Sequence, residues 1–298
     1  MKILVIDIGG TFIKYAVMQE DMSILSRGKV PTPQSGREAL IEAIGQLYDT
    51  YADVEGISIS MPGIIDSANG FCVTGGALMY NDGFPLREAL SQRCPVPIHI
   101  ANDAKCAAMA EASVGSLKDA ANGLVLLFGT MIGGGIILNH EVYMGGHFSA
   151  GEVSYIIPRP DRTVGFDNVW GNCCGTPRLC RLYTEKKGID SSTVDGVKVF
   201  EAVHQGDGDA IESLKQFTHD IAVQIFSLQT VLDPELVAIG GGISAQPVFL
   251  DYIRDNLREL YRECPYQIPQ AKIVPCKFLN DANLIGALQY YLSACAKQ

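Results

Sequence analysis

Three glycine-rich segments, each following an apolar run, are the stretches of this chain best suited to hold an anionic ligand. The first is Asp7-Ile-Gly-Gly-Thr11, and the others contain Gly133-Gly134-Gly135 and Gly240-Gly241-Gly242. Glycine permits positive φ and a close approach of the backbone to a ligand, and successive backbone N–H groups can form a nest for an anion. The three segments together favour the binding of an extended anionic ligand. Neither the single-turn phosphate-binding loop nor the dinucleotide GxGxxG spacing is present.

Asp7 ends a buried apolar run, where a carboxylate needs a partner. A hydrated Mg²⁺ carried by a nucleotide would be such a partner. An ordinary Gly-Gly hairpin with Asp7 capping its turn explains this segment equally well by itself. Thr11 and Thr130 could donate hydroxyls to phosphates, although Thr130 could also be satisfied within its own turn. Gly241 could let an adenosine face pack against the backbone.

Asn102-Asp103 stands between an apolar strand and the helix-forming residues 104–112. Asn and Asp are preferred helix N-caps, so capping is the simplest explanation. The functional alternative is that Asp103 accepts a proton from a substrate hydroxyl, because in phosphoryl transfer the base need only orient the hydroxyl and take its proton late. Glu152 is either a solvated loop carboxylate or an acceptor for sugar hydroxyls.

Cys173, Cys174 and Cys180 invite a zinc interpretation that their spacing does not support. Adjacent cysteines chelate one tetrahedral ion poorly, and no His-x₃₋₅-His follows them. We therefore expect no zinc. Trp170, the only tryptophan, lies beside them and is either part of the core or an aromatic wall that faces a sugar.

Composition limits the function classes. The 298 residues carry a net charge of −10 with a pI of about 5.0, and 47% of them are hydrophobic. The acidic balance argues against non-specific binding to nucleic acid or an anionic membrane. No apolar stretch approaches the ~18 residues of a membrane span. Nine cysteines scattered through apolar segments are typical of reduced core residues in a cytoplasmic protein, which is the location we expect.

The elements that must position these residues fall into two similar halves. Residues 3–6 and 12–18 predict a β-hairpin, and residues 124–128 and 136–138 repeat the strand–glycine turn–strand pattern. We predict a duplicated α/β fold with a ligand cleft between domains 1–118 and 119–282, and a closing helix 283–298 that can pack on the first. Further strands are expected at 23–30, 54–60, 97–101, 236–239 and 272–276, and further helices at 35–48 (capped by Ser35), 197–204, 211–232 and 248–261.

Ordered segments along nearly the whole chain resemble the ROK family of bacterial sugar kinases, part of the actin–hexokinase–heat-shock ATPase superfamily. Residues 7–14 resemble the first phosphate motif, residues 101–111 the catalytic segment, and residues 129–137 the second phosphate motif. The remaining matches are the turn 60–66 beside the sugar, the adenosine motif 232–244 and the closing helix 283–288.

The resemblance implies an ATP-dependent sugar kinase with duplicated actin/hexokinase-like (ribonuclease H-like) domains, acting as a homodimer. It implies that Asp103 is the base toward a sugar 6-hydroxyl, that Asn102 and Glu152 hold the ring, and that Gly63 lies against it. Asp7 would serve the Mg²⁺ of ATP through water. The nucleotide would be bound by Gly9, Gly10, Thr11, Lys14, Thr130, Gly133, Gly134 and Gly241.

One departure from the family pattern concerns zinc. Members usually read Gly-Glu-Ile-Gly-His before a cysteine-rich zinc loop that ends Cys-Leu-Glu. Here Tyr155 replaces the zinc histidine, and Val169-Trp170-Gly171 stands where Cys-Leu-Glu would be. The chain therefore resembles the zinc-less branch, which includes β-glucoside kinases. We expect phosphorylation of cellobiose or gentiobiose, with Tyr155 and Trp170 offering aromatic surface to the second sugar ring.

Alternatives remain within and outside the kinases. Glucokinase and N-acetylmannosamine kinase are the alternatives among enzymes. A sugar-responsive ROK regulator is the non-enzyme alternative, but such regulators carry an N-terminal helix-turn-helix, whereas the first strand here starts at residue 3. A heat-shock-type ATPase is disfavoured because no peptide-binding domain follows.

Overall fold

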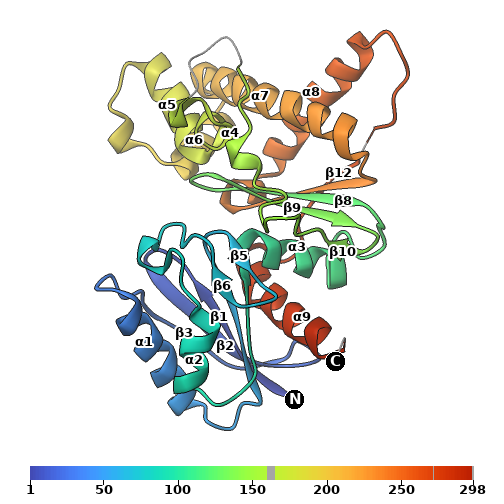
Figure 1. Ribbon diagram of the computed structural model, residues 1–298. Coiled ribbons are helices and arrows are strands. Elements are labelled where there is room, and N and C mark those ends of the chain that lie inside the picture. Colours follow the sequence, from blue (N-terminus) through green and yellow to red (C-terminus); the bar gives the residue numbers. More distant parts are fainter. Residues whose placement is uncertain (160–164, 271, 297–298) are drawn as a thin grey trace. The chain divides into compact units, whose positions relative to one another are not determined.

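The computed structural model describes residues 1–159, 165–270 and 272–296 (Figure 1). Its internal contacts divide the chain into two compact units. The first unit comprises Met1–Gly115, Glu141–Ala150 and Asn280–Gln298, and the second comprises Ser116–His140 and Gly151–Leu279. The closing helix thus belongs to the first unit. So does the segment 141–150, which the sequence pattern assigned to the second half.

The first unit is built on one mixed sheet with the strand order β3-β2-β1-β4-β7. β1 and β2 form the predicted antiparallel hairpin, in which Asp7 lies opposite Lys14. β4 runs parallel to β1, and β7 runs parallel to β4. The bounds are β1 (Lys2–Ile8), β2 (Phe12–Gln19), β3 (Ile24–Pro31), β4 (Gly56–Met61) and β7 (Ile98–Asn102), with a small hairpin of β5 (Ile65–Asp66) and β6 (Phe71–Cys72) and the short η1 (Met79–Asn81).

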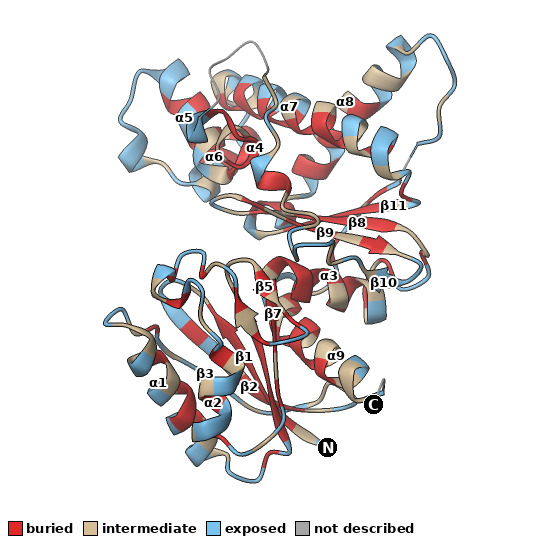
Figure 2. Cartoon of the chain, viewed as in Figure 1, coloured by how far each residue is buried: buried red, intermediate tan, exposed pale blue. Residues whose placement is uncertain are grey.

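Alternate residues of β1 face two different helical layers. Leu4 and Ile6 pack with α1 (Arg37–Thr50) and α2 (Leu86–Arg93), whereas Ile3 and Val5 pack with α3 and α9. Figure 2 shows β1 and β7 buried along most of their length. The backbones of α3 and α9 touch, since a Cβ added at Gly286 would lie 1.7 Å from the carbonyl oxygen of Cys106. The bounds are α3 (Asp103–Val114), η6 (Leu279–Asp281), α9 (Ala282–Ala296) and β10 (Glu141–Val142).

The second unit repeats this sheet topology. β8 and β9 form an antiparallel hairpin, β11 runs parallel to β8, and β12 runs parallel to β11. A hairpin followed by two strands parallel to its first strand therefore occurs in both units, and the predicted duplicated α/β fold is confirmed. The bounds are β8 (Gly123–Phe128), β9 (Ile132–Leu138), β11 (Leu236–Gly240) and β12 (Lys272–Pro275).

Helices cover one face of this second sheet around an aromatic core. Phe249 packs edge-on against Phe128 with ring centroids 5.5 Å apart, and Phe217 and Phe200 lie next to Phe249. Among the described residues, no helix is both long and apolar enough to cross a membrane. The bounds are α4 (Trp170–Cys174), α5 (Thr176–Lys187), α6 (Gly196–His204), α7 (Gly208–Leu232) and α8 (Pro247–Glu263), with short turns η2 (Val153–Tyr155), η3 (Phe166–Asn168), η4 (Ser191–Thr193) and η5 (Gly242–Ala245).

Two local predictions were wrong. Ser35 does not cap α1, because Gly36, at φ 138°, is the residue that precedes the helix, and no side chain caps it. Gly133 and Gly134 lie inside strand β9 and not in a glycine turn, which is only residues 129–131. A Cβ on Gly134 would meet the carbonyl oxygen of Gly151 at 2.4 Å, so a close backbone approach accounts for this glycine.

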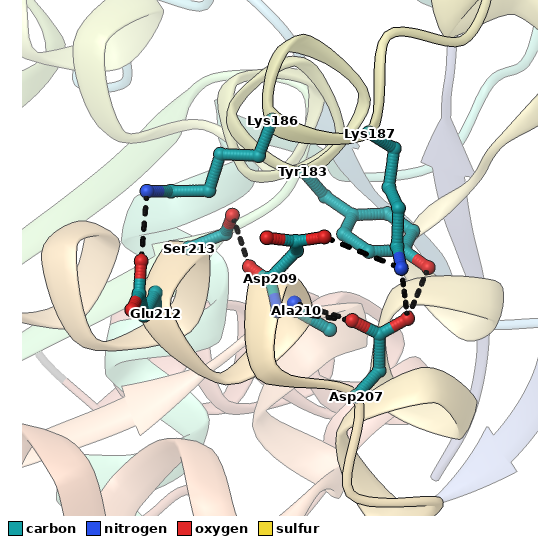
Figure 3. A network of polar contacts seen from close by, with 8 residues as sticks. All are labelled: Tyr183, Lys186, Lys187, Asp207, Asp209, Ala210, Glu212 and Ser213. Carbon is teal, nitrogen blue, oxygen red and sulfur yellow. Dashed lines mark hydrogen bonds and ion pairs between the residues drawn. The ribbon is translucent and has the colours of Figure 1, made fainter.

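A network of ion pairs joins α5 to the start of α7 (Figure 3). Asp207 caps α7 by accepting the backbone N–H groups of Asp209 at 2.9 Å and Ala210 at 3.3 Å. Its other carboxylate oxygen lies 2.8 Å from Nζ of Lys187 and accepts the Tyr183 hydroxyl at 3.1 Å. The Lys187 ammonium is the main cause that holds the pKa of the Asp207 carboxyl below its ordinary value.

We predict that Asp207→Asn lowers the midpoint of thermal unfolding at pH 7. Asn caps a helix about as well as Asp, so the substitution removes mainly the charge that pairs with Lys187. A carboxyl with a depressed pKa stabilises the fold above its ordinary pKa, and this contribution is lost as the pH falls through the folded value. The difference between wild type and variant should therefore begin to shrink as the pH falls below about 4 and disappear once the carboxyl of the folded protein is protonated.

The matched control is Glu212→Gln. Glu212 pairs with Lys186 at 3.1 Å across the same two helices, but its side chain is 68% exposed. Exposed pairs contribute little, so this variant should unfold as wild type does at every pH. Equal losses in both variants, or a loss in Asp207→Asn that is the same at pH 3 and pH 7, would contradict the prediction.

Candidate active site

The predicted catalytic residues of the first unit lie at one edge of its sheet. Asp7 is near the end of β1, Gly63 follows β4, and Asn102 ends β7 directly before Asp103 opens α3. The carboxyl ends of adjacent parallel strands meet at the same edge, which is where α/β proteins bind ligands. Both Asp7 and Asp103 act electrostatically on the buried thiol of Cys106, which lies in the first turn of α3.

Asn102 is the cap of α3, and this settles which of the two neighbouring residues has that role. Its side-chain oxygen accepts the backbone N–H of Lys105 at 3.1 Å, and its side-chain amide donates to the carbonyl oxygen of Gly63 at 2.9 Å. Asp103 is the first helical residue and is half-buried, with Oδ1 accepting the N–H of Ala104 at 2.7 Å. The helix start therefore depends on Asn102, and the macrodipole favours a carboxylate at Asp103.

Gly63 is required by the backbone. Its φ is +102°, and a Cβ there would lie 2.1 Å from the carbonyl oxygen of Thr74. Any other residue would be strained and would displace the loop that Asn102 holds. The sequence pointed to this glycine only through the family turn.

Asp7 is buried, with 7% of the whole residue exposed. Two elements distant in the sequence donate hydrogen bonds to its carboxylate. Its Oδ1 accepts the hydroxyl of Ser60 at 3.2 Å and the side-chain amide of Asn283 at 2.9 Å, while its Oδ2 lies 3.8 Å from Nζ of Lys14. A carboxylate oxygen fits a hydrated Mg²⁺, which keeps most of its waters. Sequence reasoning missed Asn283 as a partner of Asp7, because nothing local connects residues so far apart. Ser60, a polar residue in a fully buried strand, was a signal that could have been used.

The turn of the first hairpin is held by side chains that follow β3. Thr32 donates its hydroxyl to the carbonyl oxygen of Gly9 at 2.7 Å, and Gln34 donates to that of Gly10 at 2.9 Å. The N–H of Gly9 bonds to Phe12 within the turn. A phosphate at this turn would therefore be held by the N–H groups of Gly10 and Thr11, and the side chain of Thr11 is exposed.

The second unit contains a pocket of about 640 Å³ that is lined by residues of the predicted second phosphate motif and of the predicted adenosine motif. Thr130 contributes from the β8–β9 turn, Gly242 and Ile243 from η5, and the other walls come from α5 and α6. The volume is sufficient for a nucleoside. Gly241 lies at φ +90°, and a Cβ there would meet the carbonyl oxygen of Phe128 at 2.2 Å, so the turn beside the pocket needs glycine. The predicted Thr130 and the segment after Gly241 are thus parts of one pocket.

Glu152 is positioned by the residue two places after it. Ser154 is buried and bonds twice to β9: its hydroxyl accepts the N–H of Ile132 at 3.0 Å and donates to the Ile132 carbonyl at 2.6 Å. Gly151 lies against Gly134 of the same strand. These contacts fix the short turn η2 that begins directly after Glu152, which is half-buried.

The two aromatic residues expected to face the sugar have opposite environments. Tyr155 is 61% exposed, whereas Trp170 is fully buried and packs edge-on against Phe128 with ring centroids 6.3 Å apart. The burial of Trp170 favours the core interpretation, because a ring enclosed in the core has no face left for a sugar. Only Tyr155 of this pair presents a ring to solvent.

The cysteines near α4 lie in packing positions. Cys174 is buried, and burial strongly raises the pKa of its thiol, while Cys180 lines the pocket of the second unit. Within residues 1–159, 165–270 and 272–296, no three His, Cys, Asp or Glu side chains gather in a group that could hold a metal ion. The expectation that zinc is absent stays a prediction.

Comparisons with known proteins agree with this fold. The family model described as "ROK family" matches residues 3–293. A β-glucoside kinase of Klebsiella pneumoniae is 32% identical over 296 residues, which cover 98% of this chain and 96% of the relative. A ROK family protein from Streptococcus pneumoniae TIGR4, solved in complex with sucrose, is 29% identical with a TM-score of 0.90 over 100% of both chains.

A second solved structure carries a nucleotide analogue. It is a ROK family glucokinase from Streptomyces griseus in complex with glucose and AMPPNP, 25% identical, with a TM-score of 0.84 over 97% of this chain and 99% of that one. The fold and the motifs define a protein of the hexokinase-like class. More narrowly, the chain belongs to the ROK family.

We predict that Asn102→Ala destabilises the protein and that Asp103→Asn does not. Loss of an N-cap costs about 1 kcal/mol, and Asn102→Ala also loses the bond to Gly63. Asp103→Asn keeps an oxygen for the N–H of Ala104 and should change the free energy of unfolding by less than about 0.5 kcal/mol. Urea unfolding of the three proteins measures this. A larger loss for Asp103→Asn than for Asn102→Ala would mean that the helix start depends on Asp103.

Proposed function

We propose that this chain is an ATP-dependent sugar kinase that transfers the γ-phosphoryl group to the 6-hydroxyl of a glucose unit, preferentially in β-glucosides such as cellobiose or gentiobiose. The observation that carries the proposal is that two neighbouring residues at the start of α3 have different functions. Asn102 supplies the cap and the bond to Gly63, and a half-buried carboxylate follows it at Asp103. Asn102 therefore accounts for the helix cap, and Asp103 adds a carboxylate at the carboxyl end of β7.

In the proposed reaction Asp103 orients the 6-hydroxyl and accepts its proton as the phosphoryl group is transferred. A carboxylate is a weak base, but phosphoryl transfer depends mainly on position and on neutralisation of charge. Asn102 and Gly63 hold the loop beside the sugar, and Glu152, fixed through Ser154, accepts hydrogen bonds from the ring hydroxyls.

The adenosine would occupy the pocket beside η5 in the second unit, with Thr130 near its phosphates. In the first unit, Thr11 and Lys14 would contact phosphates, and Asp7 would hold a water of the bound Mg²⁺. Mg²⁺ supplies charge neutralisation when it is bound with ATP.

The preference for β-glucosides is supported by Tyr155 and by the name of a relative. Tyr155 is 61% exposed and lies three residues after Glu152. An exposed aromatic ring packs well against the apolar face of a second pyranose. The Klebsiella pneumoniae relative is named a β-glucoside kinase. Trp170 has no part in this proposal because it is buried in the core.

We predict that Asp103→Asn lowers kcat by roughly 10²–10⁴ because the proton acceptor is lost. A coupled assay of ADP release measures kcat. Asp49→Asn is the control, since Asp49 pairs with Arg93 on the surface, and this variant should keep wild-type turnover. Near-normal turnover of Asp103→Asn would rule out Asp103 as the base.

We predict that cellobiose and gentiobiose have a higher kcat/KM than glucose. Tyr155→Ala should lower kcat/KM for cellobiose by about 2- to 10-fold, the value of one aromatic contact, and should change that for glucose by less than about twofold. The assay uses glucose, N-acetylmannosamine, N-acetylglucosamine and the two disaccharides side by side.

The outcomes separate the specificity from the activity. If glucose or an N-acetylated sugar is the best substrate, the β-glucoside preference is wrong and the kinase proposal stands. If no sugar is phosphorylated while one of them still binds, the regulator alternative gains support and the kinase proposal fails.

A further inference from the structure

The two oxygens of the Asp7 carboxylate have different surroundings. Oδ1 accepts hydrogen bonds from Ser60 at 3.2 Å and Asn283 at 2.9 Å. One carboxylate oxygen offers about two lone-pair sites, so these two donors saturate Oδ1. Oδ2 lies 3.8 Å from Nζ of Lys14, which is beyond hydrogen-bond distance. Further donors can therefore reach Asp7 only at Oδ2.

Burial holds the Oδ1 side of the Asp7 carboxylate rigid, whereas Lys14 near Oδ2 is free to move. The Asp7 side chain is 10% exposed and Ser60 is completely buried, so each would lose a partner at high cost if it rotated. The Lys14 side chain is 50% exposed and can move without such a cost. The fixed partners come from β4 and from the start of α9, two elements on which β1 already packs.

Ser60 also connects Asp7 to the helix that begins at Asp103. Its hydroxyl forms a hydrogen bond with the thiol of Cys106. Burial raises the pKa of that thiol far above its ordinary value, the bond to Ser60 opposes the shift, and the charges of Asp103 and Asp7 add to it. Cys106 therefore stays a neutral thiol, and the Ser60 hydroxyl contacts both Asp7 and the first turn of α3.

We propose that Ser60 and Asn283 are positioning residues that hold Oδ1 of Asp7, so that Oδ2 is the oxygen presented to the hydrated Mg²⁺ that accompanies ATP. The inference rests on the proposed function, in which Asp7 serves that ion. Both residues act through Asp7 and neither touches a reacting atom. They set the orientation of the carboxylate, and with it the affinity for Mg²⁺.

A merely structural role is the competing explanation, and the same strand offers a matched control for it. Ser58 lies two residues before Ser60 on β4 and is also completely buried. Its hydroxyl donates to the carbonyl oxygen of Ala287 in α9 at 2.6 Å. Ser58→Ala thus removes a buried serine hydroxyl that bonds to α9, without touching Asp7.

The experiment compares wild type with Ser60→Ala, Asn283→Ala and Ser58→Ala. The first readout is the Mg²⁺ concentration that gives half of the thermal stabilisation obtained with saturating ADP, without sugar. The second is KM for the sugar at saturating Mg²⁺. We expect Ser60→Ala and Asn283→Ala to raise the half-maximal Mg²⁺ concentration about 10-fold, the lower end of the effect of losing a residue that orients a metal site from outside its ligands. Ser58→Ala should change the half-maximal Mg²⁺ concentration by less than about twofold. KM for the sugar should equal that of wild type in all three variants.

Two results would overturn the inference. One is a half-maximal Mg²⁺ concentration in Ser60→Ala and Asn283→Ala equal to that of wild type. The other is an equal rise in Ser58→Ala, which would show that lost packing at β4 is the cause. Because Asn283 is only half-buried, Asn283→Ala still gives the answer if Ser60→Ala fails to fold. If the wild type itself shows no Mg²⁺-dependent stabilisation by ADP and no phosphoryl transfer, the proposed function fails together with the inference.

Discussion

Burial of both faces of the first sheet is the constraint on which the candidate site depends. Leu4 and Ile6 are enclosed on one side, and Ile3 and Val5 on the other, so the body of β1 has no room for a polar group. Parallel strands buried on both faces are mostly apolar along their length, and the acidic side chain of β1 stands near its end. The acidic residues of the site stand at strand ends, and each has partners that offset its burial. Chemistry is thereby confined to one edge of an otherwise apolar sheet.

The second unit has the same topology but forms a pocket where the first unit has an acidic sheet edge. Its hairpin turn and the segment after Gly241 border an apolar pocket, and the glycines are explained by backbone atoms that nearly touch. Gly241 faces the carbonyl of Phe128, and Gly134 faces that of Gly151. In the first unit, by contrast, the turn after Asp7 is open and is held by Thr32 and Gln34. One duplicated fold therefore supplies an acidic edge in one copy and a nucleoside-sized pocket in the other.

Much of this could be predicted from the sequence, because the determining signals are local. Apolar runs gave the hairpins, and a polar pair between a strand and a helix marked Asn102 and Asp103. What the sequence could not show depends on contacts between distant segments. Asn283 reaches Asp7 from the far end of the chain, and Trp170 is buried because α4 turns it onto Phe128. Ser35 failed as a cap because Gly36 provides the extended entry to α1, a choice that propensity alone does not reveal.

The closing helix has a consequence for synthesis of the chain on the ribosome. α9 fills one face of the first sheet, its Gly286 touches α3, and its Asn283 partners the carboxylate of the first strand. The amino-terminal half therefore leaves the ribosome with an uncovered apolar face. Helix α9 can cover this face only after the whole second unit has been made. At roughly 5–20 residues per second, that interval is on the order of ten seconds. Throughout it, the nascent first unit lacks the last layer of its own core.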